Sequence, residues 1–236
     1  MSNAAIYNID PIKFNLDPYP DLKAMRRDQP ISFVPELGAT LMTLREDIFI
    51  NEKLINIFSS DQPNGLMTRL MGTNMMRKDG EAHKRERQAT FKSFSPRTVK
   101  DVWKQSFVKA TSNILDSLQD KNTADLVAEF AMPVSAEALK VVTGLENMNS
   151  KEMDRVSQGM IDGVSNYSGN IEIESNCQNC TASIDYHIDK ILPKLKNNPD
   201  NSLISVQLEA GLSIDQLRAN IKLAISGGQN EPRDAI

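Results

Sequence analysis

The sequence predicts a mainly α-helical fold with a small β-hairpin near the N-terminus. Beyond residue 45 the apolar residues recur mainly three and four positions apart, and the strand-forming runs lie before that point. The composition is that of an ordinary globular chain, because 40% of the 236 residues are hydrophobic and 25% are charged. No internal repeat or linker-like tract interrupts it. We therefore expect residues 1–236 to form a single domain.

The N-terminal part combines turn signals with two β-prone runs. Asp17-Pro18-Tyr19-Pro20 should end any preceding element, because proline fixes its own φ and keeps the residue before it out of the α region. A short helix then fits residues 21–28. The β-prone runs 31–34 and 39–44 flank Pro35-Glu36-Leu37-Gly38, which predicts a β-hairpin.

The rest of the chain carries helical patterns. Apolar residues from Val99 to Leu118 form one continuous stripe, which predicts a core helix. A second stripe from Leu126 to Val141 ends before Gly144, which can take the left-handed geometry common just past a helix. The loop expected at 165–174 separates two of the further helices predicted, which cover 151–164, 179–195 and 215–224.

Charge and terminal sequence narrow the classes of partner. The chain has 27 basic and 31 acidic residues, a net charge of −4, and the two signs are interspersed. A nucleic-acid-binding surface usually needs a concentrated basic footprint, so nucleic acid is not expected as a partner. No run approaches the roughly 18 apolar residues that span a bilayer, and the first residues lack a secretory signal. We expect a cytoplasmic protein that does not enter a membrane.

His83 and Arg87 are the first candidate ligand-binding residues. They are four residues apart and therefore share one face of a helix. Two cationic or donor groups on one face suit a ligand with carboxylates or phosphates, because charge-assisted hydrogen bonds are the strong kind. The alternative is a solvated helix whose charges are paired internally by Glu81 and Glu86.

The C-terminal segment is the second candidate. An apolar helix runs into Ser226-Gly227-Gly228 and then into Asn230-Glu231-Pro232. Glycine and proline weaken a helix interior, so such a defect can admit a flat ligand against the backbone or leave a carbonyl free. The alternative is a plain helix end followed by a frayed tail.

Two further patterns leave alternatives open. Cys177 and Cys180 are the two cysteines of the chain, and they fit half a zinc site, a redox pair or two incidental reduced thiols. Four methionines near helical spacing either fill the core or line a substrate pocket; they are Met67, Met71, Met75 and Met76.

Taken in this order, these segments resemble the N-terminal half of a bacterial cytochrome P450. The His-x-x-x-Arg of His83 and Arg87 matches the family's motif, as does the following Phe94-Ser95-Pro96. The segment from Ser226 to Asp234 resembles the long central helix that crosses the distal face of the haem. The resemblance implies a partial cytochrome P450 fold, in which His83 and Arg87 bind the haem propionates.

The resemblance also implies an activity. The family's members are haem-dependent monooxygenases that oxidise an apolar small molecule with O₂, using electrons from a reductase or ferredoxin. Gly227 and Gly228 would lie against the haem. Many relatives place an acid followed by threonine where this chain has Gln229-Asn230 or Glu231-Pro232, so Asn230 and Glu231 are the candidates for proton delivery.

Members of the family are longer than this chain. Their later half carries a Glu-x-x-Arg pair and the cysteine loop whose thiolate binds the haem iron, and this sequence ends at Ile236 before either. Cys177 and Cys180 precede the distal helix, so no metal ligand is expected here. We expect the chain alone not to be catalytically competent. The alternative function is a truncated, non-catalytic helical protein that binds haem or a partner weakly.

Overall fold

The computed structural model describes residues 3–236 and confirms a mainly helical fold with a small β-sheet. Its described residues form two compact units, one ending at Ser59 and the other covering Ser60–Ile236. The expectation that residues 1–236 form a single domain stays a prediction.

The first unit contains a three-stranded sheet in which β2 (Ile31–Val34) is the central strand. It pairs with β3 (Ala39–Met42) in antiparallel register, which confirms the predicted hairpin. A 3₁₀ turn over Pro35–Leu37 connects the two strands, and Gly38 closes it at a φ of +60° that favours glycine. The sequence did not predict β1 (Ala5–Ile6), which pairs with β2 in parallel register.

Three helices accompany this sheet. The first, α1 (Pro11–Leu16), ends just before Asp17, as the proline-rich segment predicts. The second, α2 (Tyr19–Asp28), starts two residues earlier than expected, because a proline in the first helical turn needs no hydrogen-bond acceptor. The third is α3 (Arg45–Asn51). The core of the unit consists of Ile9, Met25 and Val34.

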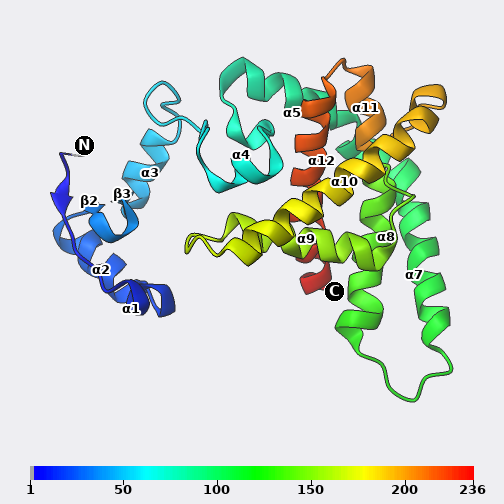
Figure 1. Cartoon of the computed structure of the whole chain (residues 1–236), viewed down its shortest axis with the longest axis horizontal. Coiled ribbons are helices and arrows are strands. Elements are labelled where there is room, and N and C mark those ends of the chain that lie inside the picture. Colours follow the sequence, from blue (N-terminus) through cyan, green and yellow to red (C-terminus); the bar gives the residue numbers. More distant parts are fainter. Residues whose placement is uncertain (1–2) are drawn as a thin grey trace. The chain divides into compact units, whose positions relative to one another are not determined.

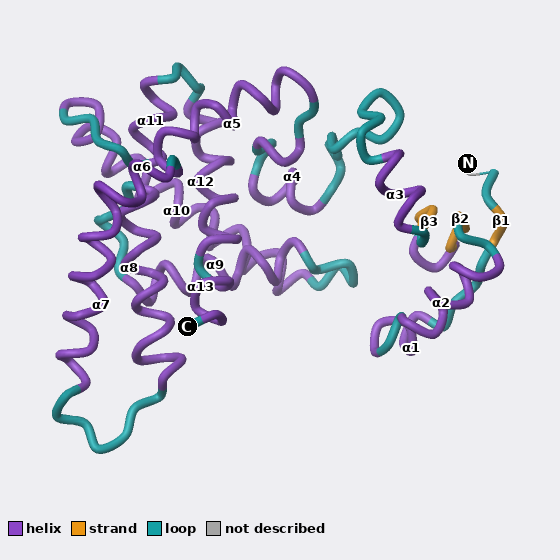
Figure 2. The backbone as a smooth tube through the Cα atoms, turned by 180° about the vertical axis from the view of Figure 1, so that it is seen from behind, coloured by secondary structure: helices purple, strands orange, loops and turns teal. Residues whose placement is uncertain are grey.

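The second unit consists of helices joined by loops, and its described residues form no strand (Figures 1 and 2). Its elements in chain order are α4 (Leu66–Met71), a 3₁₀ turn (Met75–Arg77), α5 (Gly80–Phe94), α6 (Pro96–Thr98), a π turn (Val99–Trp103), α7 (Lys104–Leu118), a second π turn (Leu126–Ala131), α8 (Met132–Thr143), α9 (Ser150–Val164), α10 (Ile171–Asn197), α11 (Leu203–Glu209), α12 (Ile214–Gly228) and α13 (Asn230–Ala235).

Most of the predicted helices are present, although their bounds differ. Helix α8 ends at Gly144, whose φ of +90° is the expected left-handed cap. Helix α10 begins at Ile171, inside the predicted loop, because the Asn170 side chain caps its first turn. Within residues 3–236, no helix combines the length and apolar character needed to cross a bilayer.

The predicted core position of the helix from Val99 to Leu118 is confirmed only at its start, where Trp103 is buried and its Nε1–H donates to the Ser93 carbonyl at 2.8 Å. No side chain of α7 is fully buried, and Val108 and Leu115 remain more than 45% exposed. Helix α8 packs along α7, whereas the buried core forms mainly between α8, α9, α10, α11 and α12. The apolar stripe therefore makes α7 a half-covered outer helix.

The two cysteines hold α9 and α10 close together. Cys177 and Cys180 are fully buried and unbonded to one another, and each faces a glycine of α9. A Cβ atom on Gly159 would lie 2.4 Å from Cys180 Sγ, and one on Gly163 would lie 2.5 Å from Cys177 Sγ. The two glycines are four residues apart and the two cysteines three, so each pair spans about one helical turn and the two helices can approach closely.

We expect Gly163→Ala to lower the free energy of unfolding by about 2 kcal/mol, because the added methyl group overpacks against Cys177. Gly227→Ala is the matched control, since its Cβ would meet no atom nearer than 3.9 Å and alanine favours a helix. Urea unfolding of both variants measures the difference. Equal stability of Gly163→Ala and the unmodified chain would contradict the close α9–α10 packing.

Candidate functional site

Glu86 ties α5 to α12. Its carboxylate is almost completely buried and accepts three hydrogen bonds. Gln216 Nε2 donates to Oε1 at 2.8 Å, Asn220 Nδ2 donates to Oε2 at 3.0 Å, and the Lys78 ammonium forms an ion pair with Oε1. A buried carboxylate is tolerated only when it is paired and hydrogen-bonded in this way. The contact therefore fixes the position of α5 against α12.

The same contact anchors the turn that precedes α5. Asn220 Oδ1 accepts a hydrogen bond from the Met75 backbone N–H at 2.8 Å, while its amide nitrogen binds Glu86. Asn220 is itself buried. One side chain of α12 thus satisfies groups on two neighbouring segments, and neither Glu86 nor Asn220 was assigned this role from the sequence. The four-residue spacing of Gln216 and Asn220 on one face of α12 was the available signal.

His83 and Arg87 lie beside this buried contact. Arg87 follows Glu86 by one residue, so its side chain projects about 100° further round α5. His83 is half-buried and Arg87 is exposed. Within residues 3–236 neither side chain has a hydrogen-bond or ion-pair partner. The alternative of internal pairing by Glu81 and Glu86 is confirmed only for Glu81, which lies 3.5 Å from Lys84 of the same helix. Glu86 binds Lys78 and α12, and neither carboxylate pairs with His83 or Arg87.

A hollow of about 180 Å³ lies on this part of α5. Arg87 lines it together with Lys84, Gln88 and Phe91, so two cations border an exposed aromatic ring and no acidic side chain lines it. Such a surface suits an apolar ligand with carboxylates, because the cations attract the anionic groups and Phe91 offers apolar contact area.

The two glycines near the end of α12 have different surroundings. Gly228 packs against α8, since a Cβ atom there would lie 2.9 Å from Leu139 Cδ1. Gly227 faces open space, and the nearest atom to its Cβ position is Glu231 Oε1 at 3.9 Å. Gly227 follows Asn220 by seven residues, which places both on the same side of α12 two turns apart. Gly227 of α12 and Glu231 of α13 therefore lie side by side where the two helices meet.

Asn230 occupies a different environment. Its side chain is half-buried, and its Oδ1 atom is buried without a hydrogen-bond partner in the described part of the chain. Pro232 has no N–H, so it cannot make the regular helical hydrogen bond to the Gly228 carbonyl. The helix defect expected from the sequence is present, because α12 ends at Gly228 and α13 begins at Asn230.

Buried polar groups support this broken stretch from α8 and α9. Ser135 Oγ donates to the Gln229 carbonyl at 2.6 Å, and Ser157 Oγ donates to the Ile225 carbonyl at 3.1 Å. Gln229 Nε2 donates to Asp154 Oδ1 at 3.2 Å. These contacts hold the end of α12 in place, so the predicted alternative of a frayed tail does not describe Gln229.

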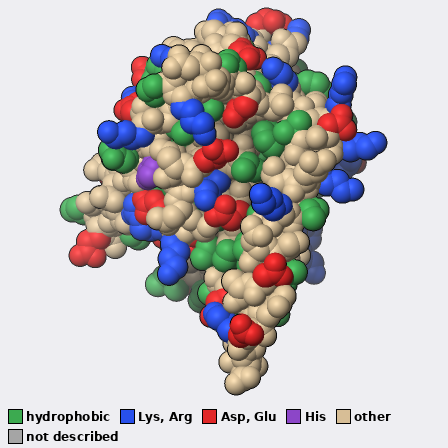
Figure 3. All heavy atoms as spheres, turned by 90° about the vertical axis from the view of Figure 1, so that its right-hand side faces the viewer, with side chains coloured by type: hydrophobic (Ala, Val, Ile, Leu, Met, Phe, Trp, Pro, Cys, Tyr) green, Lys and Arg blue, Asp and Glu red, His purple; other side chains and the backbone are tan. Residues whose placement is uncertain are grey.

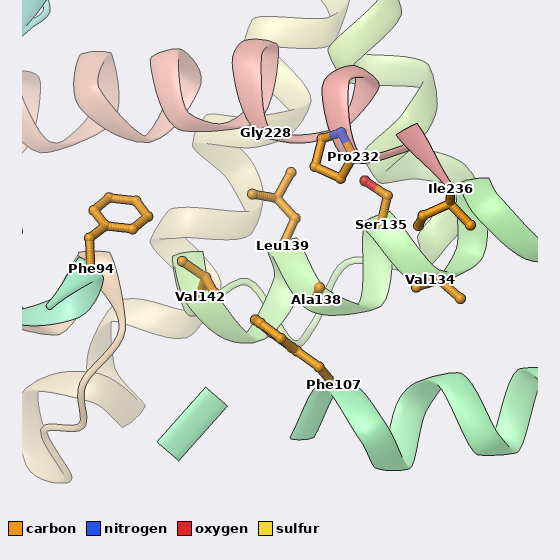
Figure 4. Close-up of a pocket in the computed structure, with 10 residues that line it drawn as sticks. All are labelled: Phe94, Phe107, Val134, Ser135, Ala138, Leu139, Val142, Gly228, Pro232 and Ile236. Atoms are coloured by element: carbon orange, nitrogen blue, oxygen red, sulfur yellow. The ribbon is translucent and has the colours of Figure 1, made fainter. Parts of the chain in front are cut away.

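An apolar cavity of about 350 Å³ lies on the Gly228 side of the α12 end (Figure 4). Leu139, Ala138 and Val142 of α8 form one wall, and Phe107 of α7 forms another. Ser135 is the one hydroxyl residue that lines the cavity, and its hydroxyl group already donates to Gln229. No other side chain in this lining carries a polar group that could orient a ligand, which distinguishes the cavity from the hollow beside Arg87.

The cysteines lie away from these groups, in the α9–α10 contact. Burial raises the pKa of the Cys177 thiol to about 11, and burial also raises the pKa of Cys180 despite the nearby Arg155. A redox-active cysteine needs a lowered pKa, so these thiols have the opposite character. Among the residues that the structure describes, no cluster of three His, Cys, Asp or Glu side chains is placed to hold a metal ion.

The surface charges agree with the sequence pattern. On the face shown in Figure 3, Lys and Arg side chains lie among Asp and Glu side chains and do not gather into one basic patch. The absence of a nucleic-acid partner stays a prediction.

Comparison with known proteins supports the family resemblance. No protein-family model matches the chain. Cytochrome P450 CYP107DY1 of Priestia megaterium is 26% identical over 212 residues, which cover 87% of this chain and 50% of that protein. The chain spans about half the length of the curated relatives it matches.

Solved structures agree on the fold. The P450BioI structure, a complex with an acyl carrier protein ligated to hexadec-9Z-enoic acid, matches with a TM-score of 0.73 at 16% identity, over 92% of this chain and 59% of that one. CYP109E1 from Bacillus megaterium, in complex with testosterone, matches with a TM-score of 0.72 at 18% identity, over 92% of this chain and 58% of that one. The chain has the N-terminal half of the cytochrome P450 fold, and the relatives it matches in sequence are bacterial cytochromes P450.

We expect Glu86→Ala to lower the free energy of unfolding by about 3 kcal/mol, because it leaves Lys78 and two amide donors without their acceptor. Arg85→Ala is the control, since Arg85 is an exposed residue of the same helix. Urea unfolding is the measurement. A loss no larger than that of Arg85→Ala would show that Glu86 does not hold α5 to α12.

The pH dependence of stability should report the Cys177 thiol. Its pKa is raised from 9.0 to about 11 in the folded chain, so folding favours the protonated thiol. This contribution is complete below pH 9 and is lost as the pH rises towards 11. The unmodified chain should therefore lose stability more steeply over this range than Cys177→Ala. Parallel stability curves from urea unfolding would contradict the raised pKa.

Proposed function

We propose that the chain is the part of a cytochrome P450-type monooxygenase that binds the haem carboxylates, through α5, and that supplies the helix on the distal side of the haem, α12. The reaction class is oxidation of an apolar small molecule by O₂ with electrons from a reductase or ferredoxin. The observation that carries this proposal is the pair His83 and Arg87, which share one face of α5 without a protein partner among residues 3–236.

The surroundings of these residues fit a haem group. Haem combines a flat apolar ring with two carboxylates, and the hollow beside Arg87 combines an exposed Phe91 ring with two cationic side chains. Arg87 and His83 would hold the carboxylates through charge-assisted hydrogen bonds. Because Glu86 is already bound by α12, it does not compete for either side chain.

When bound, haem would supply the iron centre at which O₂ is activated. The chain's own residues would shape the side of α12 that faces it. Gly227 leaves the backbone bare, so a flat group can approach closely there. Glu231 lies beside Gly227, and its carboxylate oxygen Oε1 can hold and pass on a proton. Of the two predicted proton-delivery residues, Glu231 suits this role better than Asn230, whose amide does not titrate.

The cysteines of this chain do not fit the role of iron ligand. Both Sγ atoms are buried against Gly159 and Gly163, and their raised pKa values disfavour the thiolate. A thiolate ligand would therefore come from outside residues 1–236. The proposed monooxygenase activity is therefore that of a complete P450, and not of these 236 residues by themselves.

Haemin titration tests the binding part of the proposal. We expect Arg87→Gln combined with His83→Ala to weaken haemin binding about tenfold or more, because both carboxylate partners are lost. Arg85→Gln removes an exposed positive charge from the same helix and should leave binding unchanged. Absorbance in the haem band measures the affinity. Equal weakening by Arg85→Gln would indicate a non-specific charge effect and would contradict the assigned site.

A joined protein tests the catalytic part. The chain would be fused to the second half of the Priestia megaterium relative, which supplies the region that this chain does not match. The reduced carbon monoxide adduct should then show the red-shifted band of thiolate-bound haem. A folded fusion that binds haem without this band would favour the alternative of a non-catalytic haem-binding protein.

A further inference from the structure

A third pocket in the unit Ser60–Ile236 has the features of an anion-binding site. It has a volume of about 270 Å³ and lies where three segments meet: the start of α4, the turn before α5 and the end of α9. Its apolar wall consists of Leu66, Met67 and Val164, and its polar lining comes from Gln62, Arg77, Ser165 and Tyr167.

Arg77 is the one basic residue in this lining. Its Nε atom is buried and has no hydrogen-bond partner among the described residues. The guanidinium group makes no ion pair within residues 3–236, and no carboxylate lines the pocket. A partly buried guanidinium that lacks an acceptor is unfavourable unless a ligand supplies one. A carboxylate suits this position, because it can accept hydrogen bonds from two N–H groups of one guanidinium.

The nearby acidic side chains have other contacts. Glu174 lies 3.3 Å from Arg69, so its charge is already paired. Asp162 accepts a hydrogen bond from Gln158 at 2.8 Å, and Asp79 accepts one from the Ser60 backbone N–H at 2.9 Å. None of these carboxylates lines the pocket. The positive charge of Arg77 is therefore not neutralised from within the pocket.

The position of Arg77 is fixed by buried contacts. Its backbone N–H donates to the Asn74 carbonyl at 3.0 Å, and Asn74 is completely buried. Met75, two residues earlier, is bound by Asn220 of α12. A cation on a turn that is already ordered loses little conformational freedom when a ligand binds.

The opposite rim of the pocket is also ordered. Asn166 is buried, and its side chain donates to the Asn170 carbonyl at 2.8 Å and accepts from the Asn170 N–H at 2.9 Å. This pair of hydrogen bonds closes the loop between α9 and α10, which carries Ser165 and Tyr167. Both walls of the pocket are thus held in place before a ligand arrives.

We propose that this pocket binds the carboxylate end of a small amphiphilic molecule, with Arg77 as the partner of the carboxylate and Leu66, Met67 and Val164 as the apolar wall. The binding site stands on this geometry alone. The additional statement that such a carboxylic acid is the substrate class rests on the proposed monooxygenase function. Of the methionines expected either in the core or in a pocket, Met67 lines this pocket and Met71 is buried in the core.

The test compares octanoate with its uncharged counterpart octanamide, using the full 236-residue chain without haem. Calorimetric titration should show that octanoate binds about tenfold or more tightly than octanamide, since a charge-assisted contact with arginine is the stronger kind. Arg77→Gln should remove this preference, whereas Arg77→Lys should retain part of it. Arg85→Gln is the matched control and should keep the full preference, because Arg85 does not line the pocket.

Met67→Trp is the second variant, because it fills the apolar wall and leaves Arg77 unchanged. It should weaken the binding of both octanoate and octanamide. The proposal is overturned if octanoate binds Arg77→Gln as tightly as the unmodified chain, or if the unmodified chain does not prefer octanoate.

Haemin titration of the same variants separates the two proposals. Arg77→Gln should bind haemin like the unmodified chain, and the His83 and Arg87 variants should bind octanoate like the unmodified chain. If the unmodified chain binds haemin but binds octanoate no more tightly than octanamide, the Arg77 pocket is refuted and the haem site is not. An octanoate preference that depends on Arg77, found together with haemin binding that does not depend on His83 and Arg87, would support the pocket and refute the haem site.

Discussion

The buried carboxylate of Glu86 is the interaction on which the candidate site depends. A carboxylate in a protein interior is costly unless it is paired and hydrogen-bonded, and here Lys78, Gln216 and Asn220 all donate to it. Removing one of these donors leaves a buried carboxylate oxygen with one partner fewer, so the contact favours one position of α5 against α12. Asn220 extends the same constraint to the turn that carries Arg77.

This one contact places three sets of functional candidates. On α5, His83 and Arg87 lie to one side of Glu86 and remain without protein partners among residues 3–236. On α12, the side that carries Asn220 carries Gly227 two turns further along. Before α5, the anchored turn presents Arg77 to its own pocket. Helix periodicity and the Glu86 contact together relate these groups, and α11 also packs along α5.

Local patterns in the sequence predicted much of the fold. The hairpin at Pro35–Gly38 and the helix end at Gly144 depend on backbone preferences of proline and glycine, which act over a few residues. Contacts between distant segments were not predictable in this way. Glu86 appeared to be a surface charge, because its partners Gln216 and Asn220 lie about 130 residues later in the sequence. The exposure of α7 depends likewise on which helices pack against it.

The glycine and cysteine pairs show the same limit for the candidate sites. Cys177 and Cys180 suggested metal or redox chemistry as alternatives to incidental thiols, and only the positions of Gly159 and Gly163 reveal their packing role. From the sequence, Gly227 and Gly228 had the same expected role, which was to lie against the haem. The structure separates them, because Leu139 covers Gly228, whereas the nearest atom to a Cβ on Gly227 among residues 3–236 is Glu231 Oε1 at 3.9 Å. Arg77 drew no attention in the sequence, since a lone arginine carries no spacing signal.

The most direct test of the central claim compares haemin with haemin dimethyl ester, which has the same ring but no free carboxylates. If His83 and Arg87 hold the haem carboxylates, the unmodified chain binds haemin about tenfold or more tightly than the ester, and the double variant His83→Ala with Arg87→Gln binds both equally. Equal affinity of the unmodified chain for haemin and its ester would contradict the account.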